Sequence, residues 1–158
     1  MRTRDVSLAA VYAALYAVLT VGLGPFSYLA IQVRISDAMV GLVPLLGWPA
    51  VIGHTIGVAV SNSFSPAGFL DLLNTIPSFV MAYVVMKLKG GNVRVITGLL
   101  SYTVVLSATV SWMLSHLYGL PPLETYAYVF IGIFISTVLI GFALYKTIGH
   151  LKFFGKGV

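Results

Sequence analysis

Long apolar stretches separated by short polar segments make up almost the whole chain. Residues 6–33, 38–70, 95–123 and 125–145 contain no Asp, Glu, Lys or Arg. Because a helix needs about 20 predominantly apolar residues to cross the hydrocarbon core of a bilayer, each stretch can hold at least one span. The pattern predicts an integral membrane protein whose spans are helices.

Helix-breaking residues indicate where these helices end. Gly24-Pro25 follows the first apolar stretch, residues 87–92 contain two lysines and two glycines, and residues 118–122 contain Gly and two prolines. Glycine and proline are frequent just beyond helix ends because neither residue favours continuation of a helix. The three segments therefore predict the connections after the first, fourth and fifth helices.

The segment from residue 36 to residue 61 is too long for one ordinary span and too short for two. Pro44 and Gly47-Trp48-Pro49 lie near its middle. Short, Gly- and Pro-interrupted segments often mark binding sites in transporters. We predict two shortened helices that meet at this break, and the alternative is one long kinked helix.

The predicted fold is an all-α, six-transmembrane-helix bundle with shortened helices 2 and 3. It forms a single membrane domain over residues 1–158. The predicted helices cover about residues 6–23, 36–47, 49–62, 68–88, 95–117 and 125–148.

The charge distribution supports six spans and predicts their orientation. Only 8% of the residues are charged, whereas soluble domains average about 25%, which excludes an ordinary water-soluble domain. The basic residues lie near predicted helix ends, in three groups: Arg2 and Arg4; Lys87, Lys89 and Arg94; Lys146, Lys152 and Lys156. The positive-inside rule places all three groups in the cytoplasm, which six spans with both termini inside satisfy. We expect a multi-pass plasma-membrane protein without a nucleic-acid site.

The same topology places three polar segments together on the outer side. They are residues 32–37, 62–71 and 116–124. Charged groups near a bilayer core are costly and persist mainly where function or pairing retains them. The three segments therefore predict a pocket for a small polar molecule at the outer face.

The residue types in these segments suit a heterocyclic ligand. Carboxylates accept hydrogen bonds from ring N–H groups, amides both donate and accept, and aromatic rings offer stacking surfaces. Arg34 either donates to the ligand or forms a structural ion pair with Asp37, and the aromatic residues alternatively form an interfacial belt. The predicted substrate-binding residues are Gln32, Arg34, Asp37, Asn62, Phe64, Asp71, Asn74, Trp112, His116, Tyr118 and Glu124.

Sequence features of enzymes and metal sites are weak. The chain has no cysteine, and its histidines, His54, His116 and His150, have no partner at ligand spacing. We expect His54 to be a packing or hydrogen-bonding residue. No nucleotide-binding motif or catalytic constellation is recognisable, so we expect no enzyme activity, metal or cofactor.

Small residues at a spacing of four predict close helix packing. Ala9, Ala13 and Ala17 share one face of the first helix, which can contact either another helix of this chain or another protein. Gly53 and Gly57 repeat the spacing in the third helix, where packing within the chain is the better explanation.

Two motifs resemble those of the QueT family, the substrate-binding subunits (S components) of energy-coupling factor transporters assigned to queuosine precursors. The first runs from Gln32 to Ala38 with the sequence QVRISDA, and the second runs from Asn62 to Pro66 with the sequence NSFSP, followed by Gly68 and Asp71. The length and the predicted six helices are also similar to an S component. The last third of the chain matches in hydropathy and topology rather than in a motif.

The resemblance implies an S-component-like fold that captures a 7-deazaguanine base at the outer face. Its partners would be a transmembrane coupling protein, contacted through Ala9, Ala13 and Ala17, and two cytoplasmic ATPase subunits. The alternatives are an S component for another vitamin or purine-like base, and a stand-alone small membrane channel or scaffold.

Overall fold

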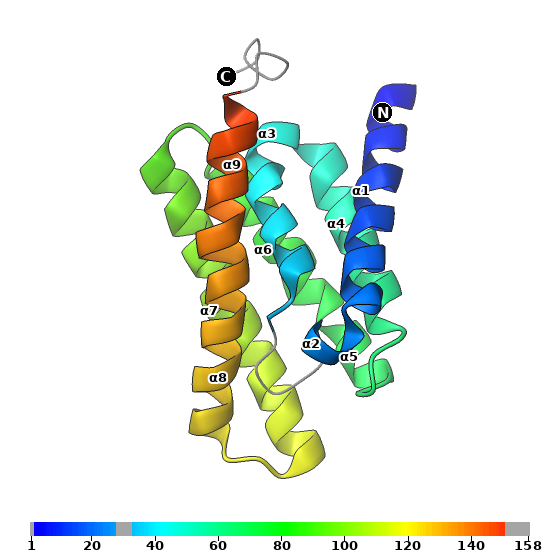
Figure 1. The fold of residues 1–158 in the computed structure, drawn as a ribbon, viewed down its shortest axis with the longest axis vertical. Helices are drawn as coiled ribbons and strands as arrows, with labels where there is room; N and C mark the ends of the chain where they lie inside the picture. The colour runs from blue at the N-terminus through cyan, green and yellow to red at the C-terminus, as the bar shows by residue number, and fades with distance from the viewer. Residues whose placement is uncertain (1, 28–32, 151–158) are drawn as a thin grey trace.

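The computed structural model describes residues 2–27 and 33–150, and these residues are helical without any strand. Figure 1 shows them as an upright bundle. The elements in chain order are α1 (Thr3–Gly22), α2 (Gly24–Ser27), the 3₁₀-helix η1 (Ile35–Leu42), α3 (Val43–Leu46), α4 (Trp48–Asn62), α5 (Phe69–Leu73), α6 (Thr75–Lys87), α7 (Asn92–Tyr118), α8 (Pro122–Phe134), the π-helix η2 (Ile135–Ile140) and α9 (Gly141–Gly149).

Several of these elements continue one another, so the described residues form six long helical units after the short α2 is set aside. Four units are long and apolar enough to cross a membrane: Thr3–Gly22, Phe69–Lys87, Asn92–Tyr118 and Pro122–Gly149. The other two, Ile35–Leu46 and Trp48–Asn62, are shorter. The predicted six-helix count, with shortened helices 2 and 3, is confirmed.

A backbone break at Gly47 separates the two short units. Gly47 has φ 67° and ψ −143°, in the region that L side chains rarely adopt, and Pro49 lies in the first turn of α4. The chain therefore turns sharply at the predicted break, which favours two short helices over one kinked helix.

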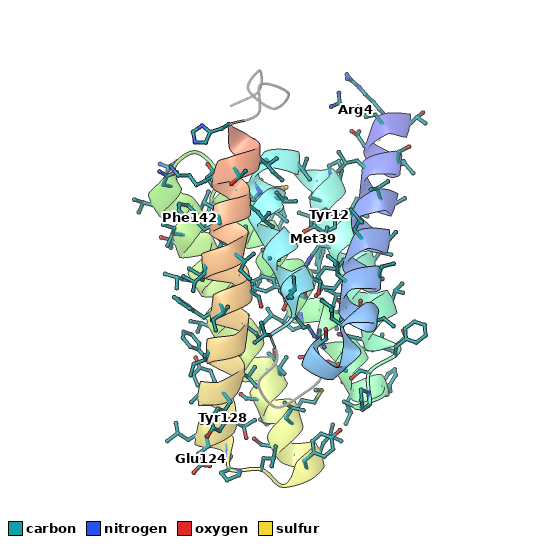
Figure 2. The ribbon with its side chains drawn as sticks, in the orientation of Figure 1. Arg4, Tyr12, Met39, Glu124, Tyr128 and Phe142 are labelled. Atoms are coloured by element: carbon teal, nitrogen blue, oxygen red, sulfur yellow. The ribbon has the colours of Figure 1, made fainter. Side chains whose placement is uncertain are left out.

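The two ends of the bundle differ in charge. Figure 2 shows Arg4, at the start of α1, at one end and Glu124, at the start of α8, at the other. The end of α9 and the α6–α7 connection lie at the Arg4 end, whereas α2, α5 and the α7–α8 connection lie at the opposite end (Figure 1). The polar segments therefore share the end that is remote from the described basic groups. Which end faces the cytoplasm stays a prediction.

α1 and α4 pack with their backbones unusually close. A Cβ atom added to Gly53 would lie 2.6 Å from the carbonyl oxygen of Ala9, and one added to Gly57 would lie 2.8 Å from Cβ of Tyr16. Gly53 and Gly57 therefore pack within the chain, as predicted. Their small size allows α1 to lie directly on α4.

This packing changes the interpretation of the alanines in α1. Ala9 is 5% exposed and Ala13 is 8% exposed, whereas Ala17 is half-buried. In the described conformation Ala9 and Ala13 are internal packing residues, because α4 occupies the face that they share. The exposed alanines of this helix are Ala10 and Ala14. Contact of the predicted alanine face with another subunit stays a prediction.

A second close approach joins η1 to α9. A Cβ atom added to Gly41 would overlap the carbonyl oxygen of Gly141, and one added to Gly141 would lie 2.9 Å from the carbonyl oxygen of Ala38. The π-helix η2, directly before α9, is linked to α7 by a 2.6 Å hydrogen bond between the hydroxyls of Thr137 and Thr103. The backbones of η1 and α9 are therefore in direct contact at Gly41 and Gly141.

We predict that Gly41→Ala destabilises the fold, because the new methyl group would overlap the α9 backbone and force the helices apart. Overpacking of this kind typically costs about 1–3 kcal/mol. The measurement is thermal unfolding of the detergent-solubilised protein, with Gly22→Ala as the matched control, since a Cβ at Gly22 meets no atom within 4 Å. Equal melting temperatures for the two variants would contradict the close approach.

Candidate functional site

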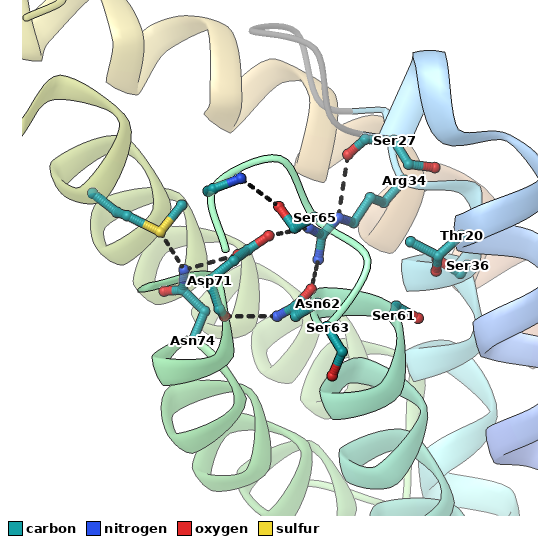
Figure 3. A network of polar contacts seen from close by, with 12 residues as sticks. Thr20, Ser27, Arg34, Ser36, Ser61, Asn62, Ser63, Ser65, Asp71 and Asn74 are labelled. Atoms are coloured by element: carbon teal, nitrogen blue, oxygen red, sulfur yellow. Dashed lines mark hydrogen bonds and ion pairs between the residues drawn. The ribbon is translucent and has the colours of Figure 1, made fainter. Parts of the chain in front are cut away.

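Five of the predicted site residues lie close together in the interior of the bundle, and Figure 3 shows all of them except Asp37. Arg34 directly precedes η1, Asp37 lies in its first turn, Asn62 ends α4, Asp71 lies in α5, and Asn74 joins α5 to α6. Each is at most 7% exposed. The structure thus brings together side chains from the first two polar segments and Asn74, whereas the prediction also included the third segment.

Arg34 is the centre of this polar cluster. Its Nη2 lies 3.2 Å from Asp71 Oδ2 in a buried ion pair, and its Nη1 donates to Asn62 Oδ1 at 3.0 Å. Its Nε donates to the carbonyl oxygen of Ser27 at 3.3 Å. The guanidinium therefore connects the segment after α1 with α4 and α5.

The structure corrects the predicted ion pair of Arg34 with Asp37. Arg34 pairs with Asp71, while Asp37 Oδ1 accepts a 2.5 Å hydrogen bond from the hydroxyl of Tyr16 on α1. The reason is tertiary, because the connection between α4 and α5 folds back and places Asp71 beside the guanidinium. Neither the approach of α5 nor the position of Tyr16, 21 residues before Asp37, is encoded in the local spacing.

Two amide side chains hold α5 against the rest of the cluster. Asn62 Nδ2 donates to the backbone oxygen of Asp71 at 2.8 Å. Asn74 Nδ2 lies 3.2 Å from Asp71 Oδ1 and 3.3 Å from the sulfur of Met113 on α7. Both carboxylate oxygens of Asp71 therefore have hydrogen-bond donors.

A second group of polar side chains lies deeper in the bundle. His54 Nε2 lies 3.0 Å from the hydroxyl of Ser78 and 3.1 Å from the hydroxyl of Tyr102. All three residues are almost completely buried. His54 is thus a hydrogen-bonding residue, as expected, but Ser78, Tyr102 and Tyr16 were missed. They lie within long apolar helices, where a lone hydroxyl gives no sequence signal.

A small cavity lies between these two groups of polar side chains. Its volume is about 20 Å³, which is close to the space that one water molecule needs. The lining residues are Tyr16, Arg34, Asp37, Val58, Asn62, Asn74, Ser78, Tyr102, Leu106, Val110 and Ile133. Small-molecule sites typically have volumes of about 300–1,000 Å³, so this cavity is much smaller than such a site.

The remaining predicted site residues are not at the cavity. Phe64, Trp112 and Tyr118 are 65%, 64% and 55% exposed, and His116 and Glu124 are also exposed. His116, Tyr118 and Glu124 lie near the ends of α7 and α8, which extend past the cluster (Figures 1 and 2). Trp112 is next to Met113, which contacts Asn74, but its side chain is exposed on the outside of the bundle. Phe64 lies in the exposed connection between α4 and α5. Gln32 lies outside the described residues, and its role stays a prediction.

Trp112 instead lines an open apolar groove between α5–α6 and α7. The groove has a volume of about 540 Å³ and is bordered by Leu70, Leu73, Asn74, Pro77, Ala108, Thr109, Trp112 and Met113. Asn74 lines both the groove and the polar cavity. The two spaces are therefore separated at this point by the Asn74 side chain and its contact with Met113.

We predict that the buried ion pair makes Arg34→Met and Asp71→Leu strongly non-additive. Each single change leaves a buried charge without its partner, which typically costs about 3–5 kcal/mol. The double variant removes both charges, so its melting temperature should exceed that of either single variant. The measurement is thermal unfolding of the four proteins in detergent, and additive losses would contradict the ion pair.

Comparisons with known proteins agree with this arrangement. Residues 6–150 match the family model described as the QueT transporter, which covers nearly the whole described structure and both polar motifs. No curated protein and no solved structure gives a significant match. Several helices are long and apolar enough to cross a membrane, in agreement with a multi-pass transport protein. The chain therefore belongs to the QueT transporter family.

Proposed function

We propose that this chain is the substrate-binding subunit of an energy-coupling factor importer. In this proposal it captures a queuosine precursor, a 7-deazaguanine base, at the face remote from the basic helix ends. Partner subunits then supply the ATP-driven step. The observation that supports the proposal most is the buried cluster of Arg34, Asn62, Asp71 and Asn74 inside an apolar bundle of the QueT transporter family.

The functional groups of the cluster suit the polar edges of such a base. A deazaguanine offers adjacent N–H donors, which a carboxylate accepts as a pair, and a carbonyl oxygen, which a guanidinium or amide N–H can bind. Asp37 and Asp71 supply carboxylates, and Arg34 and the two asparagines supply donors. Buried groups of this kind favour ligands that satisfy them, because an unpaired buried group is costly.

Binding requires the cavity to enlarge. A volume of about 20 Å³ cannot hold a bicyclic base, and the bonds of Arg34 to Asn62 and Asp71 close the cavity on one side. We propose that the ligand replaces part of these contacts as the α4–α5 connection moves outward. The same polar groups then stabilise the empty site and recognise the base.

We predict that Asp71→Asn weakens binding of a 7-deazaguanine base by at least about tenfold, because it loses a charge-assisted hydrogen bond worth roughly 1.5–3 kcal/mol. Isothermal titration calorimetry of the purified protein in detergent measures the dissociation constant. Glu124→Gln is the matched comparison, since Glu124 is an exposed carboxylate at the projecting end. A larger loss in Glu124→Gln than in Asp71→Asn would move the site to the α7–α8 end.

The partner subunits give an independent test. We expect affinity purification of the chain from its native membranes to recover a transmembrane coupling protein and two ATPase subunits, together with a bound small molecule that mass spectrometry can identify. A bound vitamin or another purine-like base would support an S component with a different ligand. Absence of both ATPases and ligand would favour a stand-alone channel or scaffold.

A further inference from the structure

We propose that the apolar groove between α5–α6 and α7 binds one acyl chain of a membrane lipid. The groove has a volume of about 540 Å³, within the range of sites that hold small molecules. None of its described lining residues is charged, and Asn74 separates it from the polar cavity. The inference concerns the outer surface of the bundle and does not depend on the proposed function.

The groove lies where one helical unit is interrupted and the other carries small residues. The unit Phe69–Lys87 is interrupted at Asn74, between α5 and α6, and Pro77 lies in the first turn of α6. On the α7 side Ala108 and Thr109 are small, and Trp112 borders the groove about one turn further along. The hollow is thus enclosed by side chains from two units rather than lying on the face of one helix.

The polar side chains of the groove are already hydrogen-bonded within the chain. Asn74 Nδ2 donates to Asp71 Oδ1 at 3.2 Å, and the hydroxyl of Thr109 donates to the carbonyl oxygen of Leu106 at 3.2 Å. A polar ligand would have to compete with these bonds, whereas an alkyl chain leaves them intact and brings no polar group of its own. The groove therefore favours an apolar occupant.

The position of the groove along the helices is the depth of lipid acyl chains. Both of its walls belong to units that are long and apolar enough to cross a membrane. α7 has 27 residues, a length of about 40 Å, which exceeds the hydrocarbon core of about 30 Å. Along the axis of α7, Ala108 and Trp112 lie about 15 Å and about 9 Å from the end of the helix at Tyr118. The groove is therefore just inside the membrane interface and continuous with the lipid-facing surface of both units.

A lipid chain suits this surface better than a helix of another protein. Leu70, Leu73 and Trp112 at the groove are 41%, 47% and 64% exposed, and residues 72–86 and 95–123 contain no Asp, Glu, Lys or Arg. Helices in membranes associate through small residues that let their backbones approach closely. The large exposed ring of Trp112 keeps another backbone at a distance, whereas a thin alkyl chain can lie beside it.

A bound chain also protects the polar cluster from the membrane side. It covers the outer surface of Asn74 and Met113, which separate the groove from the cavity and whose Nδ2 and sulfur atoms are 3.3 Å apart. The chain therefore limits the access of water to the buried ion pair through this wall.

The fluorescence of Trp112 tests the proposal directly. The sequence contains two tryptophans, so Trp48→Phe leaves Trp112 as the single emitter. Phosphatidylcholine with dibrominated acyl chains, which quenches tryptophan on contact, is titrated into this protein in excess detergent. We expect quenching that saturates at a single lipid per protein. Quenching that is absent, or that increases with added lipid without saturating, overturns the inference.

Variants in the Trp48→Phe protein assign the binding to the groove. Ala108→Leu fills the groove from an exposed position, so the half-saturating lipid concentration should rise by at least about threefold as packing contacts are lost. Leu73→Asn places an amide in the groove and should weaken binding as well, which keeps the test decisive if one variant fails to fold. Ala14→Leu, the same enlargement at an exposed alanine of α1, should retain the original value.

Two results would overturn the assignment to the groove. One is equal lipid binding by Ala108→Leu, Leu73→Asn and Ala14→Leu. The other is a dimer of the original protein in detergent that Ala108→Leu separates, because a second copy of the chain would then occupy the groove. Size-exclusion chromatography with light scattering measures the oligomeric state in the same samples.

Discussion

The buried contact between Arg34 and Asp71 is the interaction on which the arrangement of this protein depends. A guanidinium inside an apolar bundle needs a counter-charge and acceptors for its N–H groups. Asp71, Asn62 and the backbone of Ser27 supply them from three separate segments. The contacts of this one arginine therefore fix the positions of the chain after α1, the end of α4 and the whole of α5.

The length of the helices decides which polar groups share this environment. η1–α3 and α4 are short and meet at Gly47, and their other ends, near Arg34 and Asn62, lie inside the bundle. α7 and α8 are longer and carry their polar and aromatic ends, including Tyr118 and Glu124, past that depth. Close packing at Gly41 and Gly53 holds the short helices in place. The polar cluster is thus a consequence of short helices enclosed by long ones.

The polar cluster has a property that the proposed binding function needs. Its hydrogen-bonding groups bond to one another, which limits the cost of keeping them buried. In the proposed function, a ligand that enters the cavity exchanges one set of these contacts for another. Membership of the QueT transporter family agrees with such a function.

The apolar pattern by itself determined the helical fold, the six helices, the break at Gly47 and the gathering of basic residues at one end. These features are local, because hydropathy and helix-breaking residues act over a few turns of the chain. It also indicated five of the buried site residues, since polar groups in an apolar chain must find one another. Tertiary structure alone decided that Arg34 pairs with Asp71 rather than Asp37, that Tyr16 binds Asp37, and that Ala9 and Ala13 face α4. Those outcomes depend on the depth at which each helix ends and on the face that it turns toward its neighbours, and neither is encoded in residues close together in the sequence.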